Sequence, residues 1–316
     1  MQQKNQSVPF HSITYLYDSL KRIFIIVVIG LIVKFCLFDI RGIDGSQMSP
    51  SIVKGDKFVI FRLTSLPGIR NIIKPKRGQP IVFKMPFEPE NKGCLRIAGV
   101  SADTVLVDSG IFYNPKLKPA QLKIFRTTEE IVPWDYSPRD FFASYRVPAP
   151  KDTLDLDSGD LRELFLAISV IRQENPDSSF SLKPELTLDD SSANDYFINE
   201  FSLYNGLLDS IPQQYRYDWF FWTRLKEYLS MVHYNQNVEL KFTFCINNKR
   251  VSKYIVKNSY IFLLADNWKT GLDSRFFGPI KTTFVEGKTF MVLWSYDRKP
   301  EDHETLKLNR IGRIIK

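Results

Sequence analysis

The chain has 316 residues, 44% apolar and 14% aromatic, which is enough to bury a core and excludes a disordered protein. Lysine and arginine exceed aspartate and glutamate by 43 to 35, and the resulting charge of +8 favours an anionic partner, either a phospholipid surface or a nucleic acid. The three cysteines are too few for a disulfide framework, and the three histidines are widely spaced. We therefore expect no metal site, and no cofactor because GxGxxG and GxxxxGK[ST] motifs are absent from the sequence.

The first predicted element is an apolar helix near the N-terminus. The run Ile23 to Phe38 is interrupted by one charge, Lys34, whose long side chain can reach the headgroups. The run spans roughly 24 Å of a ~30 Å hydrocarbon core, and apolar residues upstream can extend it. No small-residue cleavage site follows, so residues 1–40 are predicted to form an uncleaved, single transmembrane anchor. The alternative, a buried core helix, is disfavoured because no polar stripe is present.

Basic residues flank this predicted anchor unequally. Lys4, Lys21 and Arg22 precede it, whereas Arg41 follows it. Positive charge favours the cytoplasmic side, so we expect a cytoplasmic N-terminus and export of the remaining chain.

The next predicted segment, residues 41–120, is rich in strand-forming residues separated by Gly and Pro. Ile81 to Phe83 form a continuous apolar run between Pro80 and Pro86, as in a buried strand. The segment is predicted to be a strand meander, with strands at KFVIF, QPIVFK, CLRIAGV and DTVLVD.

Residues 121–237 change character and are predicted to be a mixed, helix-rich insertion. Apolar residues recur at helical spacing from Asp160 to Gln173, with Ser158 or Asp160 as the N-cap. The aromatic residues from Trp219 to Trp222 are expected in the core rather than in a ligand platform. Further helices are predicted at Ala193 to Leu208 and at Tyr217 to His233.

Strand patterns return over residues 238–316. Val238 to Ile246 alternates in polarity and is followed by Asn247 and Asn248, a turn pair, and by a second strand. The predicted fold class is therefore mainly β, an antiparallel β core split by a helical (α+β) insertion and preceded by one transmembrane helix. Cys94 and Cys245 are expected to be unpaired and buried.

Four boxes in this sequence resemble those of type I signal peptidases. The first, IDGSQMSPSIVKGDKFVIF (Ile43 to Phe61), is similar to S-x-S-M-x-P-T-L followed by G-D. The last, YIFLLADNWKTGLDSRFFGPI (Tyr260 to Ile280), is similar to G-D-N-x-x-x-S-x-D-S-R-Y-W-G. Between them, RGQPIVFKMP (Arg77 to Pro86) resembles R-G-D-I-V-V-F-x-x-P, and LRIAGVSADTV (Leu95 to Val105) resembles K-R-x-V-G-x-P-G-D.

The resemblance implies a β fold on the outer face of the bacterial cytoplasmic membrane, single-pass, with most of the chain on the periplasmic side. It also implies cleavage of signal peptides by a Ser/Lys dyad. A serine hydroxyl needs a base to take its proton, and lysine serves as that base when burial lowers its pKa. The oxyanion needs further donors, in this family often a serine hydroxyl.

The positions that the resemblance assigns to catalysis carry other residues here. Gln47 stands at the nucleophile and Leu95 at the general base, and neither side chain can perform that chemistry. Gly45 stands at the oxyanion-hole serine and Gly271 at the serine that orients the lysine. Because loss of the nucleophile or base alone costs a serine hydrolase on the order of a millionfold, we predict no catalytic residues.

Other positions of the boxes keep the family's residue. Asp273 and Arg275 are expected to support the fold through ion pairing and turn hydrogen bonds. The retained residues are Met48, Pro50, Gly55, Asp56, Arg77, Gly78, Arg96, Gly99, Asp266, Asn267, Asp273, Ser274, Arg275 and Gly278.

A relocated active site is the competing interpretation. Ser46 and Ser49 flank the lost nucleophile, and Lys54, Lys84 and Lys92 lie nearby in sequence. A shift by one residue in an extended strand turns the side chain to the opposite face, so Ser46 would not inherit the geometry. Lys84 is expected to face the surface.

The sequence thus predicts a catalytically inactive signal-peptidase-like membrane protein, a binding or scaffold subunit of an export or assembly complex. The expected partners are the lipid bilayer and proteins of secretion or envelope assembly, with the Trp219 to Trp222 region as one interface. Extended peptides could also add as a strand to a retained groove edge. The alternative is an active signal peptidase with a relocated nucleophile. Nucleic acid is disfavoured by the export orientation, so the +8 charge is assigned to a membrane surface.

Overall fold

The computed structural model describes residues 10–43, 45–62, 75–88, 90–117, 138–157, 160–193, 217–268, 271–298 and 304–315. The helix predicted at Ala193 to Leu208 lies, apart from its first residue, outside these ranges. The helices are α1 (Phe10–Leu37), α2 (Leu161–Glu174), α5 (Trp219–Val232), α6 (Ser274–Phe277), η3 (Thr282–Phe284) and η4 (Leu308–Arg310). The strands are β1 (Phe38–Gly42), β2 (Asp56–Phe61), β3 (Pro80–Lys84), β4 (Lys92–Val100), β5 (Thr104–Asp108), β6 (Ile111–Tyr113), β7 (Phe142–Arg146), β8 (Thr153–Asp155), β9 (Phe180–Leu188), β10 (Ser191–Ser192), β11 (Val238–Ile246), β12 (Lys249–Arg250), β13 (Lys253–Ile255), β14 (Tyr260–Leu264), β15 (Ile280–Lys281), β16 (Val285–Arg298) and β17 (Glu304–Leu306).

The main sheet is antiparallel, as the predicted fold class requires. Its strand order is β1-β2-β16-β3-β4-β14-β15, with β17 paired to β16. The four predicted strands of residues 41–120 are present as β2, β3, β4 and β5, but their arrangement as a meander is wrong. The long strand β16 separates β2 from β3, and β5 pairs with β6 and β7 in a different sheet. Neither pairing is set by local sequence.

A core of apolar side chains packs on this main sheet. Met48, Phe58, Phe83, Leu95 and Leu263 are all at most 1% exposed within it. The continuous apolar run predicted between two prolines is confirmed, because residues 80–83 are buried along β3 and only Lys84 is exposed.

The helix predicted at Asp160 to Gln173 is confirmed as α2. Asp160 is its N-cap, and its carboxylate accepts hydrogen bonds from the amides of Arg162 (2.8 Å) and Glu163 (3.3 Å). Ser158, the other N-cap candidate, lies outside the described residues. The helix predicted at Tyr217 to His233 is confirmed as α5, with Asp218 as its N-cap.

The aromatic side chains at the start of α5 belong to the core, as predicted. Trp222 is fully buried, and the centre of its ring lies 4.9 Å from the centre of the Phe242 ring. Trp219 is 8% exposed and its Nε1 donates to the carbonyl of Arg275 (3.0 Å). The two tryptophans are therefore not available as an interaction surface.

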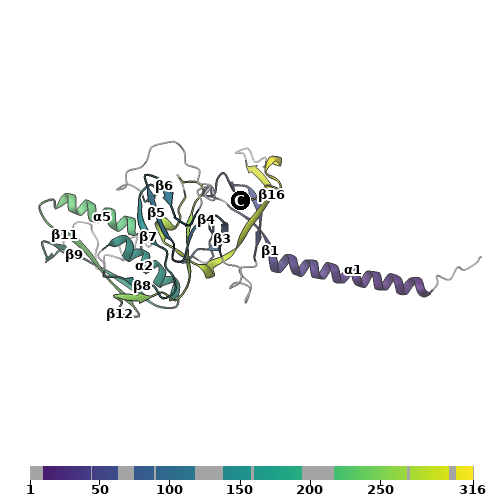
Figure 1. Ribbon diagram of the computed structural model, residues 1–316, viewed down its shortest axis with the longest axis horizontal. Coiled ribbons are helices and arrows are strands. Elements are labelled where there is room, and N and C mark those ends of the chain that lie inside the picture. Colours follow the sequence, from purple (N-terminus) through teal and green to yellow (C-terminus); the bar gives the residue numbers. More distant parts are fainter. Residues whose placement is uncertain are drawn as a thin grey trace, which may run out of the picture.

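Strand β11 has the predicted alternation and ends in the predicted turn. Asn247 and Asn248 have φ of 49° and 63°, the left-handed values that such a turn requires. The strand pairs along its whole length with β9, from Val238 opposite Leu188 to Ile246 opposite Phe180. It therefore shares a sheet with β9, β10 and β12, and this sheet lies with α2 and α5 at the end of the body away from α1 (Figure 1).

Helix α1 contains the apolar run and extends away from the body as one rod (Figure 1). It ends at Leu37, and Phe38 already belongs to β1, opposite Phe61 of β2. Within the part of the chain that the structure describes, no helix combines the length and apolarity needed to cross a bilayer.

Candidate functional site

The first and last boxes of the sequence meet in the structure. The backbone amide of Asn267 donates to the carbonyl of Gln47 (2.9 Å), and its side-chain amide donates to the carbonyl of Ser46 (3.2 Å). Met48, fully buried, packs in the same core cluster as Leu95. Segments more than 200 residues apart in sequence therefore form one site.

The two glycines of this site differ in the space around them. Among the described atoms, a Cβ at Gly45 would have Gln47 Cγ, at 3.8 Å, as its one neighbour within 4 Å. A Cβ atom at Gly271 would lie 2.0 Å from the Cβ of Ala265 and 2.9 Å from the carbonyl oxygen of Asn267. A serine therefore fits at Gly45, whereas the Cβ of Ala265 and the carbonyl oxygen of Asn267 leave no room for one at Gly271.

Position 95 has become part of the core. Leu95 is 1% exposed in β4, opposite Ile81 of β3, and its neighbours are apolar side chains. Burial raises the pKa of the adjacent thiol of Cys94 well above its ordinary value, as expected for an apolar interior. Such surroundings do not solvate an ammonium group.

The next residue along β4, Arg96, is also buried but is fully paired. Its Nε and Nη2 bind the two carboxylate oxygens of Asp266 at 2.6 and 2.5 Å, and its Nη1 donates to the carbonyl of Gly78 (2.7 Å). This bidentate pair joins β4 to the last box. Both residues therefore act in holding the sheet together.

Three further charged residues retained in the boxes, Asp56, Asp273 and Arg275, belong to pairs of the same kind. Asp273 accepts from Arg275 Nε (2.8 Å) and Nη2 (2.7 Å), which confirms the predicted structural role of that pair. Asp56 accepts from Arg310 Nε (2.8 Å) and Nη2 (2.6 Å). Burial alone would raise the pKa of Asp56, but the hydrogen bonds from Arg310 lower it below its ordinary value. No motif pointed to Arg310, which lies 254 residues away from Asp56 in sequence.

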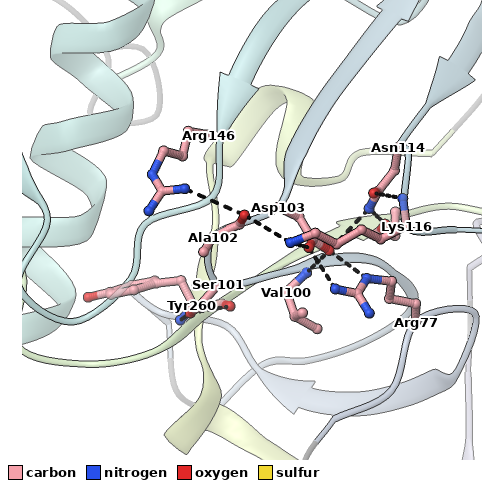
Figure 2. Close-up of polar contacts among 10 residues, drawn as sticks. Arg77, Val100, Ser101, Ala102, Asp103, Asn114, Lys116, Arg146 and Tyr260 are labelled. Carbon is pink, nitrogen blue, oxygen red and sulfur yellow. Dashed lines mark hydrogen bonds and ion pairs between the residues drawn. The ribbon is translucent and has the colours of Figure 1, made fainter.

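Asp103 is the centre of a fourth charged cluster (Figure 2). Arg77 donates to both of its oxygens at 2.6 Å, and Asn114 and the ammonium of Lys116 lie at 3.2 and 3.3 Å. Burial opposes ionisation, but the hydrogen bonds from Arg77 and the Val100 amide lower the pKa of Asp103 to about 2. This carboxylate is therefore ionised at neutral pH.

The turn before this carboxylate is held in a strained conformation. Ala102 has a φ of 66°, and its carbonyl faces Lys116 and Arg146 in Figure 2, at 3.4 and 3.5 Å. Ser101 bridges to the backbone of Tyr260, accepting from its amide (2.8 Å) and donating to its carbonyl (3.1 Å). The contacts of this box are thus structural.

The residues of the competing, relocated site lie in exposed surroundings. Lys54 and Lys84 are exposed, and the expectation for Lys84 is confirmed. Lys92 binds Glu286, with its amine 2.9 and 2.8 Å from the two carboxylate oxygens. Ser46 is exposed and Ser49 is half-buried.

Metal-binding and thiol chemistry have little support among the described side chains. In these ranges no three His, Cys, Asp or Glu residues are grouped as metal ligands. Cys94 and Cys245 are free thiols, as predicted, but only Cys94 is buried, because Cys245 lies half-buried near the end of β11.

A cavity of about 640 Å³ lies apart from the boxes, where α2 and α5 face strands β5 and β7. Phe142 and Trp219 form part of its apolar wall, while Arg162, Lys226 and Glu227 contribute charge. None of the residues predicted for catalysis lines it, so it is separate from the site that the boxes form.

Comparison with known proteins identifies the origin of the boxes. The model of the family described as "Signal peptidase, peptidase S26" matches residues 16–130 and 213–294 and leaves 131–212 unmatched. The chain is also 22% identical over 311 residues to a protein named Signal peptidase I from Buchnera aphidicola (strain APS), covering 95% of this chain and 82% of that one.

Proposed function

Because the chain belongs to the signal peptidase S26 family, we propose that it is a catalytically inactive member that works by binding. Its function is that of a scaffold subunit in an export or assembly complex outside the cytoplasm. The observation that carries this proposal is the burial of Leu95 at the position of the general base.

A Ser/Lys dyad requires a lysine that is buried yet reaches a hydroxyl. Leu95 fills the buried position with an apolar side chain, and Gln47 offers an amide where the hydroxyl belongs. The alternatives Lys54 and Lys84 are exposed to solvent. No pair among these residues combines burial with nucleophile chemistry.

Retention of the charged box residues is consistent with a scaffold. Breaking a buried pair of arginine and aspartate costs about 3–5 kcal/mol whether or not the site is catalytic. Arg96 with Asp266 and Arg275 with Asp273 are buried pairs of this kind. The fold alone accounts for keeping them.

We propose further that α1 anchors the chain in the bacterial inner membrane, with the β body on the periplasmic side. Among the described residues, no segment covers the apolar side chains of α1, since Ile23, Phe24 and Ile26 are 57%, 67% and 68% exposed. The +8 charge suits the headgroup surface beside such an anchor. Retention in the membrane pellet after alkaline carbonate washing supports this placement, and release into the wash contradicts it.

A cleavage assay tests the proposed loss of chemistry. Purified full-length protein is incubated with a preprotein, alongside an active signal peptidase as positive control. We expect no cleavage. Cleavage that survives Gln47→Ala and disappears in Ser46→Ala or Ser49→Ala would establish the alternative, an active peptidase with a relocated nucleophile.

Isolation of the native assembly tests the binding role. Gentle detergent extraction at native expression, followed by affinity purification, is expected to recover the chain with stoichiometric proteins of secretion or envelope assembly. Recovery of a clean monomer would contradict the scaffold proposal.

A further inference from the structure

Arg172, in the last turn of α2, is held by aromatic rings. Its guanidinium carbon lies 4.0 Å from the ring centre of Phe87 and 3.9 Å from that of Tyr217, with Phe180 further away at 6.0 Å. At these distances the guanidinium stacks on the ring faces of Phe87 and Tyr217, which favours its positive charge. We call Arg172, Phe87 and Tyr217 the arginine clamp.

The arginine clamp is built from segments of different origin. Phe87 lies in the connection between β3 and β4, and Tyr217 directly precedes the N-cap of α5. Both fall within the segments matched by the family, whereas Arg172 lies in the unmatched residues 131–212. The segments matched by the family therefore supply the two rings of the arginine clamp but not its arginine.

Arg172 is half-buried and has no acidic partner among the described residues, unlike the buried arginines. Arg96, Arg275 and Arg310 each bind an aspartate with two hydrogen bonds. For Arg172, burial lowers the pKa and the nearby Tyr217 offsets this only in part. Its side chain is thus partly desolvated, its hydrogen-bond donors are not among the buried atoms of the described structure, and no described protein group accepts from them.

We propose that the arginine clamp is a binding site for a carboxylate. A partly desolvated guanidinium is stabilised by an anion that accepts two of its hydrogen bonds. Because the rings of Phe87 and Tyr217 lie against its faces, an anion reaches it through the edge, in the guanidinium plane. A planar carboxylate places both of its oxygens in that plane, whereas a tetrahedral phosphate that binds through two oxygens carries its other oxygens out of the plane, on the sides where the rings lie.

The test measures thermal unfolding of the full-length protein in detergent, in sodium acetate and in sodium chloride of equal ionic strength. We expect acetate to raise the unfolding midpoint of the wild type by about 2–4 °C, because a ligand that binds the folded state stabilises it. Arg172→Lys keeps the charge but removes the planar pair of donors, so the acetate shift should disappear. Arg250→Lys, at an exposed pair with Asp157, is the matched control and should keep the shift.

Further unfolding measurements identify the chemistry of the anion and its source. An equal acetate shift in the Arg172→Lys variant, or no shift in the wild type, would overturn the proposal, and so would a larger Arg172-dependent shift in inorganic phosphate. N-acetyl-glutamate amide replaces acetate in a second series. Tighter binding of this probe supports a carboxylate carried by a protein side chain, and equal binding supports a small free carboxylate.

Discussion

Replacing Leu95 with lysine tests directly whether the general-base position has become core. The new ammonium would replace a side chain that is 1% exposed, beside Arg96, whose guanidinium already occupies both oxygens of Asp266. A lysine buried in this way has a pKa of about 6, against about 10.4 in the unfolded chain. Its protonation therefore favours unfolding.

The magnitude follows from the difference between these two pKa values. At pH 7 the unfolded chain binds the proton and the folded chain does not, over about 3.4 pH units at about 1.4 kcal/mol each, or about 4–5 kcal/mol. The folded pKa is depressed, so this penalty grows as pH falls below about 10 and levels off near pH 6. The free energy of unfolding of Leu95→Lys should consequently rise with pH across that window.

The assay is urea unfolding of the detergent-solubilised protein at a series of pH values, with Leu95→Met as the matched control. The methionine variant keeps the volume and apolar character, so its cost should stay below about 1.5 kcal/mol and follow the pH dependence of the wild type. If Leu95→Lys is as stable as Leu95→Met and shows no additional pH dependence, position 95 is open to solvent and the argument for a lost base site fails.

Three further predictions concern the same site and its ion pairs. Gly45→Ser should be nearly neutral in urea unfolding, whereas Gly271→Ser should cost about 1–3 kcal/mol through overpacking; equal effects would contradict the space described for these glycines. Asp103→Asn should lower the free energy of unfolding by up to about 2 kcal/mol at pH 7, because the folded pKa of the wild-type carboxylate is depressed to about 2. In acid unfolding, the stability difference between the wild type and this variant should shrink as pH falls from about 4 to about 2. Asp266→Ala leaves Arg96 buried without its carboxylate and should cost about 3–5 kcal/mol by urea unfolding, and a cost below about 1 kcal/mol would show that the pair is hydrated.

Local sequence patterns predicted where the helices and strands of this fold lie better than they predicted which strands pair with each other. The N-cap at Asp160, the buried run of β3 and the asparagine turn after β11 follow from spacing within a few residues. The position of β16 between β2 and β3 does not, because strand pairing over more than 200 residues leaves no local signal. Strand β9 was missed, since Pro184 in its middle argues against a strand.

The same distinction holds for the candidate site. The boxes located Gln47 and Asn267, which the structure brings together, because their order and spacing are visible in the sequence. The partner of Asp56 could not be found, since Arg310 lies in a short helical turn near the C-terminus with no motif around it. The tight packing around Gly271 is likewise invisible in sequence, because it depends on where Ala265 lies.

The place of β16 in the main sheet has a consequence for how the chain is made. Strands β2 and β3 both pair with β16, which is synthesised more than 200 residues later, and Asp56 pairs with Arg310, which is synthesised later still. Until then their unpaired edges are exposed to other chains, since the long loop that joins them to β16 must close first. Completion of this sheet is therefore a late, post-translational event, and shortening the C-terminus should harm the first strands before the last ones.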